Sequence, residues 1–128
     1  MRILALIVMV IGLAALVCGV IFLPMASSGR NEIATSIAPL TLDQVNAKYD
    51  VVAAKYDQIK MAEEPAIQAQ TAMPSAMYNY LSAQRALLGL AKANIGTVNF
   101  IQFVGILNIL IGLGMVLTGF FIFRKNSA

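Results

Sequence analysis

Two uncharged apolar segments, one near each end of the chain, constrain the fold more than any other feature of the sequence. The first runs from Ile3 to Leu23 and the second from Phe100 to Phe123. A helix needs about 20 consecutive apolar residues to cross the hydrocarbon core of a bilayer. We therefore predict transmembrane helices at residues 1–24 and 99–124.

Small residues recur at every seventh position of both apolar segments. A strict seven-residue repeat keeps one helix face toward a partner, and small side chains let two backbones approach closely. The pattern predicts a helix–helix interface, formed either between the two spans of one chain or with another subunit. The repeating residues are Ala5, Gly12 and Gly19 in the first segment and Gly105, Gly112 and Gly119 in the second.

Asn108 is the most polar residue near the middle of the second segment. A carboxamide in hydrocarbon is costly unless it is hydrogen-bonded. We predict that Asn108 forms a hydrogen bond at the helix–helix interface. The alternatives are that it binds a ligand or lines a polar path.

A cleaved secretory signal is the alternative interpretation of the first apolar segment. Arg2 supplies a basic start, and the small residues Ala26, Ser27 and Ser28 suit a cleavage site. The apolar core of a signal peptide, however, has about 7–15 residues, and the run from Ile3 to Leu23 is longer. This length favours an uncleaved span.

The basic residues indicate a topology. The net charge is +3, and residues 25–98 carry six basic and six acidic residues, so the excess comes from Arg2, Arg124 and Lys125. Basic residues beside spans favour the cytoplasm. We expect both termini, including a short tail at 125–128, to be cytoplasmic, with 25–98 outside the plasma (inner) membrane. Because the middle segment mixes both signs, we expect no nucleic-acid partner.

The middle segment divides into a linker and a helical region. Breakers such as Ser27 and Gly29 predict a linker at 25–40, after Pro24 ends the first span. Thr41 and Gln44 then form a capping-box pattern.

Residues 41–98 are expected to form two helices joined by a turn at about 64–74, between Pro65 and Pro74. The adjacent carboxylates Glu63 and Glu64 fit either the end of the first helix or a short extra helix that begins at Pro65.

Apolar residues spaced by threes and fours run along both predicted helices. This spacing is typical of a coiled-coil seam, so we predict an antiparallel helical hairpin outside the membrane and an all-α fold. The predicted hairpin seam consists of Leu42, Val45, Tyr49, Val52, Tyr56 and Ile59 on one helix and Met77, Leu81, Leu88, Ala91 and Ile95 on the other.

The groups that usually support catalysis are scarce. The chain has no histidine, and its one cysteine, Cys18, lies within an apolar span. The usual general base and a structural metal site are therefore missing. We expect no enzymatic activity, no catalytic or metal site and no cofactor, and bound lipid is compatible with this expectation.

These features predict a structural role. The order of span, outer helical segment and span is similar in outline to the sensor half of bacterial chemoreceptors, and this likeness is one of architecture only. We expect a non-catalytic accessory subunit of a larger membrane complex, with lipids and other integral-membrane subunits as partners. The alternative is a self-assembling homo-oligomer, such as a holin-like pore former.

Overall fold

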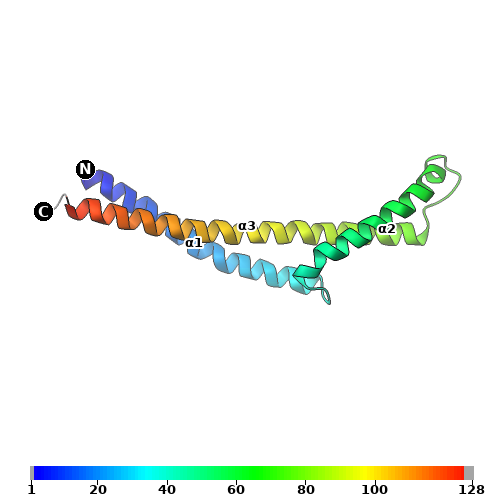
Figure 1. Ribbon diagram of the computed structural model, residues 1–128, viewed down its shortest axis with the longest axis horizontal. Helices are drawn as coiled ribbons and strands as arrows, with labels where there is room; N and C mark the ends of the chain where they lie inside the picture. Colours follow the sequence, from blue (N-terminus) through cyan, green and yellow to red (C-terminus); the bar gives the residue numbers. More distant parts are fainter. Residues whose placement is uncertain (1, 126–128) are drawn as a thin grey trace. The chain divides into compact units, whose positions relative to one another are not determined.

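In a computed structural model, which describes residues 2–125, the chain is built from three helices (Figure 1). They are α1 (Arg2–Ser36), α2 (Leu42–Gln68) and α3 (Ala76–Lys125), and no strand occurs among the described residues. The predicted all-α fold class is confirmed. Met1 and residues 126–128 of the predicted tail lie outside the described part of the chain.

Two of the helices, α1 and α3, are long and apolar enough to cross a membrane. Their most apolar 18-residue stretches have mean hydropathies of 3.1 and 2.3, and most of the side chains in these stretches are exposed. Exposed apolar surface on this scale is costly in water and is expected against lipid.

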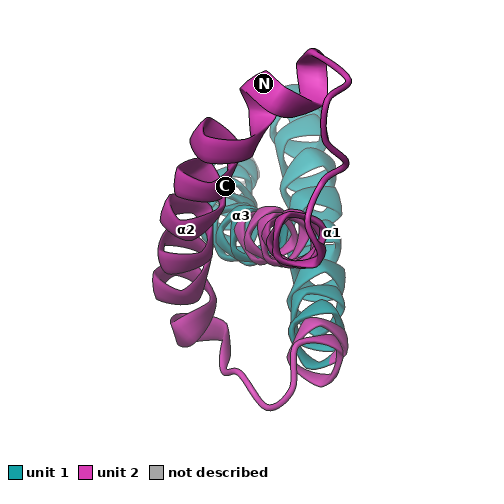
Figure 2. Ribbon diagram, turned by 90° about the vertical axis from the view of Figure 1, so that its right-hand side faces the viewer, with its two compact units in different colours: residues 1–31, 97–128 teal, residues 32–96 magenta. Residues whose placement is uncertain are grey.

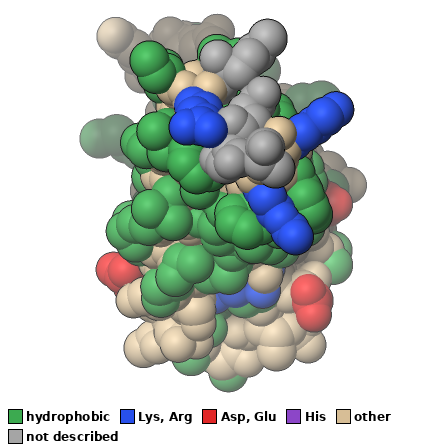
Figure 3. Space-filling model, turned by 90° about the vertical axis from the view of Figure 1, so that its left-hand side faces the viewer, with side chains coloured by type: hydrophobic (Ala, Val, Ile, Leu, Met, Phe, Trp, Pro, Cys, Tyr) green, Lys and Arg blue, Asp and Glu red, His purple; other side chains and the backbone are tan. Residues whose placement is uncertain are grey.

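The chain forms two compact units (Figure 2). Unit 1 contains residues 1–31 and 97–128, and unit 2 contains residues 32–96. Within unit 1, α1 lies beside the second half of α3, and the start of α1 and the end of α3 are at the same end of the unit (Figure 1). Figure 3 looks onto this end and shows Lys and Arg side chains among hydrophobic ones.

The prediction that Pro24 ends the first helix, followed by a linker at 25–40, was wrong. Helix α1 continues through Pro24 to Ser36. Proline removes one backbone donor and costs about 3 kcal/mol inside a helix. Packing offsets this cost, because the small and apolar repeat continues with Ala26 and Ile33, both of which are buried. Only the end of the predicted linker leaves the helix.

The first helix of the predicted hairpin also extends past its predicted end. Gln44 accepts a hydrogen bond from the Thr41 backbone N–H at 3.0 Å, as its capping-box position predicts. At the other end, α2 continues through Pro65 to Gln68, so Glu63 and Glu64 belong to α2 and not to a separate short helix.

A Schellman motif explains where α2 stops. The N–H of Thr71 donates to the Ala66 carbonyl at 2.9 Å, and the N–H of Gln70 donates to the Ile67 carbonyl at 3.0 Å. Gln70 has a φ of 57°, the left-handed conformation that this motif requires. The carbonyls of the last turn are thereby satisfied beyond the proline.

The connection to α3 is held by Ser75. Its side-chain oxygen accepts the Tyr78 N–H at 3.1 Å, and its own N–H donates to the Glu63 carboxylate at 2.9 Å. Hydrogen bonds from Ser75 hold the pKa of Glu63 below its usual value. From this start α3 runs without interruption to Lys125, and neither Gly89 nor Gly96 breaks it.

The core of unit 2 joins α2 to the first part of α3. Its buried members are all residues of the predicted hairpin seam: Val45, Val52, Leu81, Leu88 and Ala91. Partly buried neighbours pack around them, four from the predicted seam (Tyr49, Tyr56, Ile59 and Ile95) and two from outside it (Ile37 and Leu40).

Two residues of the predicted seam lie outside this core. Leu42 is half-buried and Met77 is 55% exposed. Both lie within the first two residues of their helices, at the ends of the predicted seam. The three-and-four spacing identifies a helix face but does not show how deeply each residue of that face is buried.

Two tyrosines meet across unit 2. The hydroxyls of Tyr56 and Tyr78 are hydrogen-bonded at 3.3 Å, and the ring centroids are 5.4 Å apart. The bond with Tyr56 raises the pKa of Tyr78 to about 12. A group whose pKa is raised on folding stabilises the fold fully below its unfolded value. This contribution is therefore lost as the pH rises from about 10 toward 12.

Replacing Tyr56 with phenylalanine tests this pair. In Tyr56→Phe we expect Tyr78 to ionise closer to its ordinary pKa of 10.0, because its hydrogen-bond partner is gone. An alkaline titration followed by tyrosinate absorbance measures the change. Tyr80→Phe is the control, because Tyr80 bonds Gln84, and it should leave the most alkaline step in place. Identical titrations of wild type and Tyr56→Phe would contradict the pairing.

Candidate functional site

The small residues of the two spans meet in unit 1. The glycine seam, as we call it, consists of Ala5, Gly12 and Gly19 on α1 and Gly105, Gly112 and Gly119 on α3, and all six are buried. Gly12 lies against Gly112, Gly19 against Gly105, and Ala5 against Gly119. Residue numbers fall along α3 as they rise along α1, so the two helices pack antiparallel.

The backbones of the two helices are in direct contact at this seam. A Cβ added to Gly112 would lie 2.6 Å from the Gly12 carbonyl oxygen and 2.7 Å from the Leu16 nitrogen. A Cβ added to Gly12 would lie 2.9 Å from the Gly112 carbonyl oxygen. Real Cβ atoms do not approach backbone atoms so closely, so any residue other than glycine would push the helices apart.

The second glycine pair has the same geometry. A Cβ on Gly19 would lie 2.6 Å from the Gly105 carbonyl oxygen, and one on Gly105 would lie 3.2 Å from the Gly19 carbonyl oxygen. Such close approach places Cα–H groups opposite carbonyl oxygens and increases the van der Waals contact of the two helices. Packing of this kind does not depend on water, so it operates in a bilayer.

The seam continues past the residues predicted from the sequence. Ala26 and Val98 occupy the next positions of the repeat, and both are buried. A Cβ on Gly29 would lie 2.9 Å from a Val98 methyl carbon, and Arg30 donates to the Asn99 side-chain oxygen at 2.7 Å. The signal was present, since Ala26 is seven residues after Gly19, but the polar breakers around it obscured the pattern.

Asn108 lies at the edge of the glycine seam. It is three residues after Gly105 and four before Gly112, which places it on the same face of α3, and it is half-buried. No side-chain hydrogen bond of Asn108 is found within residues 2–125. The facing span has no amide or hydroxyl side chain between Ile3 and Leu23, so α1 offers no side chain of those types to bond it.

The described residues hold no cluster of three or more His, Cys, Asp or Glu side chains that could bind a metal ion. Cys18 is exposed on α1. Titratable groups of unit 2 take part in surface ion pairs, in tyrosine contacts and in hydrogen bonds such as the one that Glu63 accepts from the Ser75 N–H. The described residues provide surfaces for helix packing and groups for hydrogen bonding.

No protein-family model, no curated protein and no solved structure matches this chain.

A matched pair of alanine substitutions tests the glycine seam. Gly112→Ala introduces a methyl group against the α1 backbone, and overpacking of this kind typically costs about 1–3 kcal/mol. Gly114→Ala introduces the same group where nothing lies within 4 Å, and alanine favours a helix over glycine by up to about 1 kcal/mol.

The free energy of unfolding, measured for the purified chain in mild detergent by circular dichroism, should fall for Gly112→Ala and stay level or rise for Gly114→Ala. Equal stabilities of the two variants would mean that the seam is not closed within the chain.

Proposed function

We propose that this chain is a non-catalytic structural subunit of an integral-membrane assembly. Asn108 is the observation that carries the proposal. Its amide lies in the more apolar half of α3 and has no hydrogen bond within the described chain. Because an unpaired amide in hydrocarbon is costly, a partner outside the chain is the natural source of the missing bond.

The internal use of the glycine seam supports this role. Small residues are the usual contact surfaces of membrane helices, and here they are buried between α1 and α3. A partner subunit must therefore contact other faces, and Asn108 lies where one such face begins. A closely packed two-helix unit with a polar group at its edge suits a stabilising or scaffolding subunit.

The charge distribution supports a topology for this subunit. Arg2, Arg124 and Lys125 flank the spans, and basic flanks favour the cytoplasm. About 20 helical residues cross a bilayer core, so much of the 35-residue α1 and the 50-residue α3 extends beyond it. In this proposal residues 25–98 lie on the extracytoplasmic side of the plasma (inner) membrane and present a helical hairpin to partners.

A homo-oligomer is the second candidate function, and Asn108 is also the observation that favours it. A carboxamide both donates and accepts, so Asn108 could pair with its equivalent in a second copy across a two-fold axis. The two candidates differ in what the native particle contains: other polypeptides in the first case, and copies of this chain alone in the second.

The proposal is tested by the mass and composition of the particle extracted gently from native membranes. We expect a particle much larger than the 13.7 kDa chain that contains other polypeptides in fixed ratio, as measured by native mass spectrometry. A monomer, or a particle made of this chain alone, would contradict the proposal of an accessory subunit.

Substitution at Asn108 tests the contact itself. Asn108→Leu removes a hydrogen bond worth about 0.6–2 kcal/mol between membrane helices, which corresponds to roughly 3- to 30-fold weaker association. Asn108→Gln, which keeps the amide, is the matched control and should retain more of the complex. If the leucine variant assembled as well as wild type, Asn108 would not be a subunit contact.

A further inference from the structure

The two sides of the helix pair in unit 2 are built differently. A direct repeat in α2, Ala47-Lys48-Tyr49-Asp50 and Ala54-Lys55-Tyr56-Asp57, places equivalent side chains seven residues apart. The Asp of each repeat faces a basic residue of α3 on one side of the pair. The Lys of each repeat lies on the other side, along a groove.

The aspartate side is closed by contacts to α3. Asp57 pairs with Arg85 at 3.3 Å, and Asp50 pairs with Lys92 at 3.9 Å. The same two cations lie over the tyrosine rings of the repeats, Arg85 at 5.1 Å from the Tyr56 centroid and Lys92 at 4.9 Å from the Tyr49 centroid. Each cation on this side therefore has both a carboxylate and an aromatic face.

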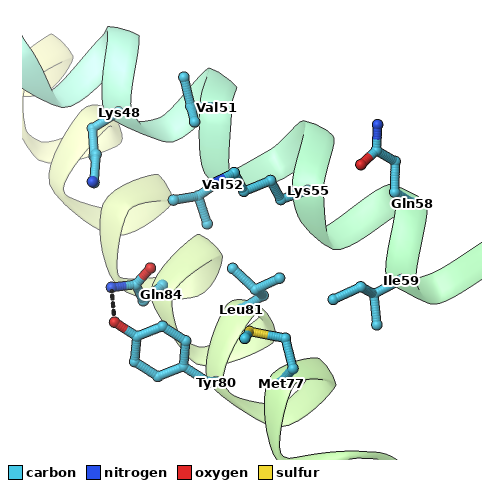
Figure 4. A pocket seen from close by; sticks show the side chains of 10 residues that line it. All are labelled: Lys48, Val51, Val52, Lys55, Gln58, Ile59, Met77, Tyr80, Leu81 and Gln84. Carbon is cyan, nitrogen blue, oxygen red and sulfur yellow. Dashed lines mark hydrogen bonds between the residues drawn. The ribbon is translucent and has the colours of Figure 1, made fainter.

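The lysine side is open. A groove of about 380 Å³ runs between α2 and α3 here, and Lys48 and Lys55 line it from α2 (Figure 4). Both lysines are exposed, and no ion pair of either is found among residues 2–125. No carboxylate lines the groove. Two cations one heptad apart are thus left without a counter-charge.

Exposed apolar side chains accompany these lysines. Val51, Met77 and Tyr80 line the groove with exposed fractions of 52%, 55% and 57%. On the α3 side, Gln84 donates to the Tyr80 hydroxyl at 2.7 Å (Figure 4), which fixes a polar rim. Apolar side chains beside paired cations form a surface that matches an amphipathic partner with acidic residues.

We propose that this groove docks an acidic amphipathic helix of a partner subunit, with carboxylates seven residues apart against Lys48 and Lys55. Seven helical residues span about 10.5 Å, so two such carboxylates on one helix reach both lysines while the apolar face covers Met77 and Val51. The inference rests on the proposed function, because it names the chemistry of the partner that unit 2 would contact.

A second copy of this chain is the less suitable occupant. The chain has its own carboxylates at seven-residue spacing, Asp43, Asp50, Asp57 and Glu64. Asp50 and Asp57 already pair with α3, and Glu64 pairs with Lys60 at 3.6 Å. A second copy would have to break these pairs to offer two carboxylates, whereas an acidic helix of another protein would not.

Zero-length crosslinking of the native particle tests the inference. A carbodiimide joins an amine to a carboxylate only where the two are in contact, and mass spectrometry then identifies both residues. We expect Lys48 and Lys55 to be joined to Asp or Glu residues seven apart in another polypeptide. The intrachain pair of Lys60 and Glu64 is the internal control and should crosslink in the same sample.

The outcomes separate this inference from the proposed function. A particle that contains other polypeptides, in which Lys60 crosslinks but Lys48 and Lys55 do not, overturns the inference alone. Crosslinks from these lysines to a second copy of the chain also overturn it. A particle that contains only this chain overturns the proposed function together with the inference.

A variant pair supplies a second readout. The double substitution Lys48→Gln with Lys55→Gln removes both groove cations, and two exposed ion pairs of this type are together worth enough to weaken association by roughly 2- to 30-fold. Lys60→Gln is the control outside the groove and should not change association. Equal retention of the partner by the double variant and this control would overturn the inference.

Discussion

The direct contact of two helix backbones at the glycine seam is the constraint on which the arrangement of unit 1 depends. Gly12 and Gly112 each lie so close to the other's carbonyl oxygen that neither position can hold a Cβ without displacement. In lipid, where burial of apolar area gives helices little reason to associate, close packing of this kind is a main source of attraction. The seam sets both the antiparallel direction and the register of α1 on α3.

A closed seam also determines which surfaces remain for partners. The small-residue faces of both spans are used inside the chain. The polar groups that have no partner among the described residues are therefore the main candidates for contacts with other subunits. Asn108 in α3 and the pair Lys48 and Lys55 in α2 are such groups, and they differ in chemistry. An amide suits contact within hydrocarbon, whereas lysines beside exposed apolar side chains suit contact in water.

Much of this arrangement could be predicted from spacing alone. The seven-residue repeat identified the residues that meet in the glycine seam, and the three-and-four spacing identified the buried core of unit 2, including Val45 and Leu81. Both patterns report which face of a helix is apolar or small. Such a spacing can be recognised in a single sequence, because every turn of a packed helix must place an apolar or small residue on the same face.

The helix ends could not be predicted in the same way. Local breakers around Pro24 indicated a linker, yet α1 continues to Ser36, because buried Ala26 and Ile33 outweigh the local preference. Likewise α2 passes Pro65, since Thr71 and Gln70 satisfy the last carbonyls from beyond the proline. The difference between the two sides of the helix pair in unit 2 could not be predicted either. The sequence shows that Lys48 and Asp50 recur seven residues later, but it does not show that α3 pairs with the aspartates and leaves the lysines exposed.

The structure pairs the two spans backbone to backbone within one chain. Solid-state NMR of the protein in lipid bilayers tests this directly, through the magnetisation transfer between the Gly112 Cα and the Gly12 carbonyl carbon. A seam that is closed within the chain predicts a cross-peak whose intensity per labelled chain stays constant when labelled protein is diluted with unlabelled protein. No cross-peak, or one that fades on dilution, would contradict it and would place the seam between chains.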